Sequence, residues 1–146
     1  MAESVAPESQ PPTVAQRLAA ADELLRGIVT DAGGLWSRAT VWILRLALEQ
    51  SIDRLWLVVA PPLARCSMRA QLLALDSYAG QETSARISAL WATLSRVGHH
   101  QDYELAPTAV ELRRWFDETA RLADELAALA ESDNLAMGKQ PHTVRS

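Results

Sequence analysis

The stretch WSRATVWILRLALEQSIDRLWLVV, Trp36 to Val59, is the most apolar segment of the chain. At a rise of about 1.5 Å per residue it would form a helix roughly 36 Å long. Because it is apolar on most of its circumference, we expect other helices to contact it from several sides. Pro61-Pro62 follow directly and predict its end. The segment therefore predicts a helical protein built around one central helix.

The polar residues of this segment gather on one side of the expected helix, at Arg38, Trp42, Arg45, Glu49 and Asp53. One interpretation is a solvated edge, on which an Arg45–Glu49 pair stabilises the helix by about 0.3 kcal/mol. The other is a row of polar groups that faces a functional cleft. The residues alone leave both interpretations open.

Two shorter helices are predicted from local signals on either side of this segment. Thr13 and Gln16 have the spacing of a capping box, and Gly33-Gly34 predict the end of the helix that follows. Ser67 is a suitable N-cap for the other helix, and Gly80 is a suitable residue to end it.

The second half of the chain predicts two amphipathic helices. Thr83 is expected to cap the first and Gly98 to end it, and Thr108 with Glu111 forms a second capping box. One side of the first carries only small residues, which suits close approach of a neighbouring helix or a second subunit: Ala85, Ser88, Ala89, Ala92 and Ser95. No strand-like alternation, repeat or glycine-rich phosphate loop is present. The sequence predicts an all-α, up-down bundle of four to five helices.

Length and composition predict one domain. The chain has 146 residues, and we expect a disordered arm at 1–12, a single helical bundle at 13–131 and a flexible tail at 132–146. A net charge of −4 argues against a generally basic nucleic-acid coat, although residues 36–69 hold five arginines against two acids. The single cysteine, Cys66, and the polar N-terminus predict a cytoplasmic protein with no membrane contact.

The residues able to bind a phosphate, a metal or a proton are concentrated in SRVGHHQDYELAPT, Ser95 to Thr108. They are Arg96, His99, His100, Asp102, Tyr103 and Glu104. An imidazole could move a proton from a ribose 2′-hydroxyl while Arg96 stabilises the phosphate charge. Alternatively, the histidines could cap the carbonyls that end the helix, or His99 or His100 could ligate a metal with Asp102 or Glu104. No HxxxH or CxxC spacing supports a metal, and we expect no metal and no cofactor.

A helix that ends in arginine and histidine before a capped final helix, following an apolar helix with charged residues, resembles the HEPN superfamily. The resemblance lies in residues 85–129, above all in Ser95-Arg96-Val97-Gly98-His99-His100 and the helix start at Thr108. It implies an all-α homodimer, often a metal-independent ribonuclease of toxin–antitoxin or phage-defence systems. An arginine and a histidine from each subunit meet across the dimer interface in such proteins.

Carried over to this chain, the resemblance makes Arg96 the phosphate-binding arginine and His100, or else His99, the general acid and base. Arg45, Glu49, Asp102 and Tyr103 are the candidate supporting residues. Three residues separate Arg96 from His100, whereas the family usually has four to six between its arginine and histidine. Many family members look like non-cleaving binding modules. The alternative prediction is therefore a non-catalytic module that binds a partner protein, antitoxin-like or regulatory, through the acidic C-terminal half.

Overall fold

The computed structural model describes residues 9–27, 35–99 and 106–138. Within these ranges it has no strand and contains the helices α1 (Val14–Arg26), α2 (Leu35–Val59), α3 (Pro61–Ala64), α4 (Met68–Ala79), α5 (Gln81–His99) and α6 (Ala109–Gly138). The predicted all-α class is confirmed. The expected number of helices was four to five, and the additional element is α3, a single turn that begins at Pro61.

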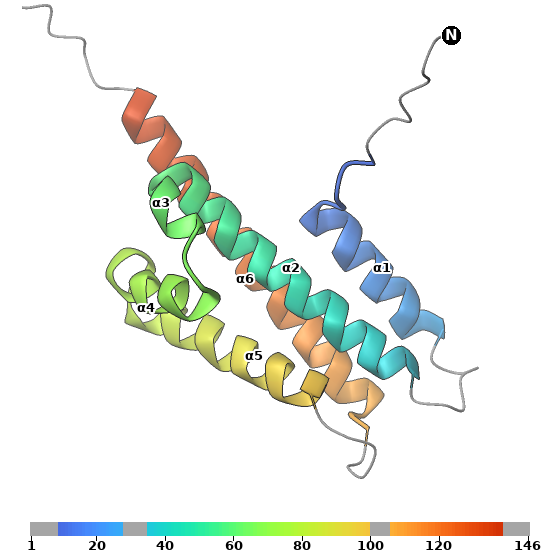
Figure 1. Cartoon of the computed structure of the whole chain (residues 1–146). Helices are drawn as coiled ribbons and strands as arrows, with labels where there is room; N and C mark the ends of the chain where they lie inside the picture. The colour runs from blue at the N-terminus through green and yellow to red at the C-terminus, as the bar shows by residue number, and fades with distance from the viewer. Residues whose placement is uncertain (1–8, 28–34, 100–105, 139–146) are drawn as a thin grey trace, which may run out of the picture.

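The helix α2 is the centre of the bundle, as its sequence predicted. It lies beside α6 along the length of the molecule, with α1 on one side and α4 and α5 on the other (Figure 1). It contacts each of the other helices. Its buried apolar side chains are Val41, Leu44, Ala47, Leu48, Ile52, Leu55 and Trp56. Burial from several sides explains why this segment is apolar around most of its circumference.

The predicted N-caps are present at three helix starts. The Gln16 amide donates to Thr13 Oγ1 at 3.2 Å, and the Thr13 amide donates back to Gln16 Oε1 at 2.9 Å. The second capping box has the same pattern between Thr108 and Glu111, at 3.1 and 2.9 Å. Ser67 caps α4 because its side chain accepts a hydrogen bond from a backbone amide in the first turn of that helix. Each bond satisfies a backbone donor that the helix itself leaves without a partner.

Two predicted helix boundaries of α5 are wrong. Gly80 ends α4 at a positive φ of 85°, and α5 begins at the next residue, so Thr83 lies inside the helix instead of capping it. The Ser84 amide donates to the Gly80 carbonyl at 3.0 Å, which makes Gly80 part of the helix start. Gly98 also lies inside α5, which continues to His99.

The ends of α1 and α6 also differ from the sequence-based expectations. The C-cap of α1 is Gly27, and Gly33-Gly34 lie outside the described residues. The helix α6 runs to Gly138, past Ser132, where we expected a flexible tail to begin.

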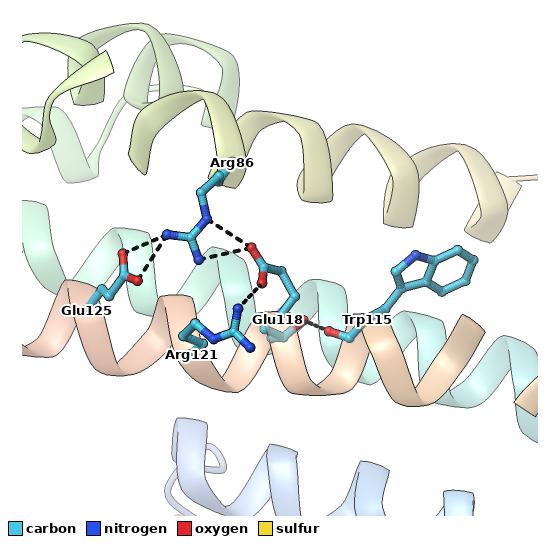
Figure 2. Close-up of polar contacts among 6 residues, drawn as sticks. Arg86, Trp115, Glu118, Arg121 and Glu125 are labelled. Carbon is cyan, nitrogen blue, oxygen red and sulfur yellow. Dashed lines mark hydrogen bonds and ion pairs between the residues drawn. The ribbon is translucent and has the colours of Figure 1, made fainter. Parts of the chain in front are cut away.

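An arginine of α5 joins this helix to α6. The Arg86 guanidinium lies between two carboxylates of α6, 3.2 Å from Glu118 and 3.1 Å from Glu125 (Figure 2). Arg121 approaches the other oxygen of Glu118 at 3.2 Å. Glu118 and Glu125 thus fix α5 against α6.

The ion pairs of an acidic residue of α1 make the stability of the fold depend on pH. Asp22 accepts from Arg113 of α6 at 2.9 Å and pairs with Arg26 at 2.9 Å. The hydrogen bond from Arg113 is the main cause that lowers the pKa of Asp22, and the charges of both arginines add to it. A lowered pKa stabilises the fold above the unfolded-state value of about 3.9, and this contribution is lost as the pH falls through the folded-state pKa.

We therefore expect the melting temperature to fall on acidification below about pH 4, and to fall less steeply in Asp22→Asn than in the wild type. Thermal melts followed by circular dichroism measure this difference. They cover about pH 2 to pH 7, a range that includes the titration of carboxyl groups. Asp117→Asn, at an exposed position of α6, is the matched control. Identical acid profiles for the wild type and Asp22→Asn would contradict the assignment.

Candidate functional site

One face of α5 points toward α2 near the C-terminal end of α5. The face carries Trp91, Ser95 and His99 at helical steps of four residues. Trp91 and His99 both contact polar side chains of α2. Gly98 also packs beside α2: a Cβ there would lie 3.9 Å from Cγ1 of Val41, an ordinary van der Waals distance, so the contact does not require glycine.

The polar face of α2 meets this end of α5. The Arg45 Nε donates to Glu49 Oε1 at 3.0 Å, and the Trp91 indole N–H donates to the same oxygen at 2.9 Å. The Arg45 guanidinium also lies over the Trp42 ring, 5.5 Å from its centroid. We refer to Trp42, Arg45, Glu49, Trp91 and His99 as the Arg45–His99 cluster. The Arg45–Glu49 pair predicted from the sequence is thus present and is tied to α5.

The contact between Arg45 and His99 is the longest of the polar contacts in the cluster. Nη1 of Arg45 lies 3.5 Å from Nε2 of His99. A guanidinium only donates, so Nε2 must be the unprotonated nitrogen of the ring for a hydrogen bond to form. At this distance the bond is weak. An incoming phosphate oxygen can therefore take the Arg45 donor from His99 at little cost, while Glu49 still holds the other side of the guanidinium.

Arg96 lies one turn before His99 on α5 and is exposed. Within the described part of the chain it makes no ion pair or hydrogen bond, so its donors are available to a ligand. Arg45 and His99 thus meet at the end of α5, with Glu49 beside Arg45, and Arg96 lies on the same helix as His99, one turn earlier. His100, Asp102 and Tyr103, the other candidate residues, lie outside the described residues.

One alternative from the sequence was that the histidines cap the carbonyls that end α5. Within the described residues, the contact of the His99 imidazole is instead with the Arg45 side chain on α2, through Nε2. The described residues also contain no group of three or more His, Cys, Asp and Glu side chains able to hold a metal ion. No described helix combines the length and the apolar run needed to cross a membrane.

Comparison with protein-family models, with curated proteins and with solved structures found no match to the chain. Its function must therefore be argued from the residues themselves.

The sequence-based reasoning missed one tryptophan of the cluster. It placed Trp42 on the polar side of α2, where this residue is 52% exposed, but it did not include Trp91, which hydrogen-bonds to Glu49. The spacing of Trp91 to His99, two helical steps of four residues, was the available signal because it places both side chains on one face.

A second feature of this side of the molecule is an open groove of about 780 Å³ between α4 and α5. The small side chains of Ala85, Ser88 and Ala92 line it, and Trp91 connects it to the Arg45–His99 cluster. Leu73, which is 80% exposed, lines the groove from α4. Ala85, Ser88 and Ala92 thus line an open surface in the described part of the chain, whereas Ser95 lies on the face of α5 toward α2.

Proposed function

We propose that the chain is a HEPN-like helical domain that binds RNA as a homodimer and cleaves it without a metal ion. The observation that carries the proposal is the contact of Arg45 with His99 at the end of α5, with the exposed Arg96 one helical turn before His99. Guanidinium groups bind phosphate through charge-assisted hydrogen bonds, and an imidazole can accept or donate a proton near neutral pH. The homodimer in the proposal comes from the resemblance of the sequence from Arg96 to His100 to the HEPN superfamily, in which two subunits share one site.

The proposed reaction is an attack of a ribose 2′-oxygen on the adjacent phosphorus. One histidine accepts the 2′-hydroxyl proton as the P–O bond forms, and a second donates a proton to the departing 5′-oxygen. The products are a 2′,3′-cyclic phosphate and a free 5′-hydroxyl. Arg96 binds the phosphate oxygens, which carry the charge that develops in the transition state. His100 or His99 of each chain moves the proton.

A dimer supplies the second histidine. The groove between α4 and α5 offers a surface for the second copy, because Ala85, Ser88 and Ala92 allow the close approach of another backbone. In this arrangement the two α5 ends contribute one composite site.

The experiment is incubation of the purified chain with labelled RNA in an excess of EDTA. Cleavage that persists in the chelator and leaves 2′,3′-cyclic phosphate ends supports the proposal. Intact RNA under these conditions would overturn the catalytic part, and failure to bind RNA as well would overturn the RNA-binding part.

A second candidate function is a non-catalytic module that binds a partner protein. The exposure of Leu73 beside the open groove favours it, since a large apolar side chain at 80% exposure gains free energy when a partner covers it. Absence of RNA cleavage together with a stable, stoichiometric complex with another protein would favour this function over the first.

A further inference from the structure

We propose that Trp42 forms a nucleobase-stacking subsite for single-stranded RNA, next to the phosphate held by Arg45. This inference rests on the proposed RNA function and adds the class of RNA and the side chain that selects it. Among the exposed large apolar side chains of the described residues, Trp42 is the only aromatic one. Its neighbours Val41 and Leu44 are fully buried, so the ring projects from an otherwise well-packed helix.

The ring is held in place by the rest of the cluster. The Arg45 guanidinium lies over the ring, 5.5 Å from its centroid, and its Nε donates to Glu49 Oε1 at 3.0 Å. Glu49 is fixed in turn by the indole N–H of Trp91 at 2.9 Å. In this series of contacts each side chain is held by the next. A ligand therefore meets a preformed surface, and binding costs little free energy for ordering these side chains.

The chemistry of the exposed surface matches a nucleotide with an unpaired base. Aromatic rings and guanidinium planes are the groups on which proteins stack the splayed bases of single-stranded RNA. A base on the exposed part of Trp42 leaves its own phosphate beside Arg45, whose guanidinium can bind it, and beside His99, one of the two histidines to which the proposed function assigns proton transfer. A base inside a duplex is already stacked on its neighbours, so double-stranded RNA cannot use the subsite.

The test uses a short RNA with 2′-O-methyl riboses, which cannot be cleaved because the attacking 2′-oxygen is blocked. Its affinity, from fluorescence anisotropy in EDTA, is compared with that of an abasic oligonucleotide of the same length and charge. We expect the base-bearing strand to bind the wild-type chain about 5- to 150-fold more tightly, the range for one base–aromatic stack.

Trp42→Ala is expected to remove this difference, so that both strands bind as the abasic strand binds the wild type. Trp42→Phe should keep part of it, since a smaller ring still stacks. Leu57→Ala is the matched control, because Leu57 is another exposed apolar residue of α2, at 59% exposure. It should retain the full preference for bases.

Three results would overturn the inference. They are an absence of preference for bases in the wild type, an equal weakening of both strands by Trp42→Ala, and a duplex that binds as tightly as the single strand. An equal loss for both strands would mean that Trp42 serves only to hold Arg45. If the wild type still cleaves RNA in any of these cases, the proposed function stands and the Trp42 subsite alone fails. If it neither binds nor cleaves RNA, both fail.

Discussion

Arg96→Ala is expected to lower the rate of RNA cleavage by about 10²- to 10³-fold, the range for loss of one group that stabilises developing charge. The melting temperature should remain close to that of the wild type, because Arg96 is exposed and makes no ion pair with the other described residues. Initial rates with labelled RNA in EDTA, together with thermal melts, measure both quantities.

Arg114→Ala is the matched control for this prediction. Arg114 is also an exposed arginine, but it lies on the first half of α6. It changes the net charge of the chain by the same amount as Arg96→Ala, so any general effect of charge on RNA binding appears in both variants. Equal losses in the two variants would contradict a specific role for Arg96.

The two histidines can be separated in the same assay. The histidine that moves the proton should lose about 10²- to 10⁴-fold in rate when it is replaced by alanine. We expect this for His100, and a smaller loss for His99→Ala through the contact of His99 with Arg45. The opposite order would assign proton transfer to His99.

Leu48→Ala is expected to lower the free energy of unfolding by about 2–5 kcal/mol, because it removes buried methyl groups and leaves a cavity in the core. Leu48 is fully buried on α2, the helix that every other helix contacts. Chemical denaturation followed by circular dichroism gives the free energy. Leu57→Ala, at an exposed position of the same helix, should change it by no more than about 0.5 kcal/mol. Similar losses in both variants would contradict the central position of α2.

The sequence predicted the features of the fold that depend on local chemistry. The capping boxes at Thr13 and Thr108 and the C-cap at Gly80 each follow from the hydrogen bonds or φ angle of a few neighbouring residues. The burial of α2 followed from its apolar composition. Such signals need no knowledge of which helix lies beside which.

The errors arose where tertiary contacts decide between local alternatives. Gly98 can end a helix, but here it lies within α5, beside Val41 of α2. Thr83 can cap a helix, but the positive φ of Gly80 sets the start of α5 three residues earlier. The pairing of Arg86 with Glu118 and Glu125 depends on how α5 lies on α6, which helical periodicity does not specify.

The same distinction applies to the candidate site. The Arg45–Glu49 pair was predictable because the two residues are one helical turn apart on α2. The contacts of Trp91 and His99 with that pair join residues 42 and 54 positions apart in the chain, and only the packing of α5 on α2 reveals them. The homodimer and the RNA ligand remain predictions.

Ultraviolet cross-linking of single-stranded RNA to the chain, with the modified tryptic peptides identified by mass spectrometry, tests the central claim most directly. The Arg45–His99 cluster falls in distinct peptides, including Ala39–Arg45, which carries Trp42, and Val97–Arg113, which carries both His99 and His100. We predict cross-links in these two peptides and their loss in the presence of an excess of unlabelled RNA. Cross-links confined to peptides of α4 or α6, or none at all, would contradict an RNA site at the contact between α2 and α5.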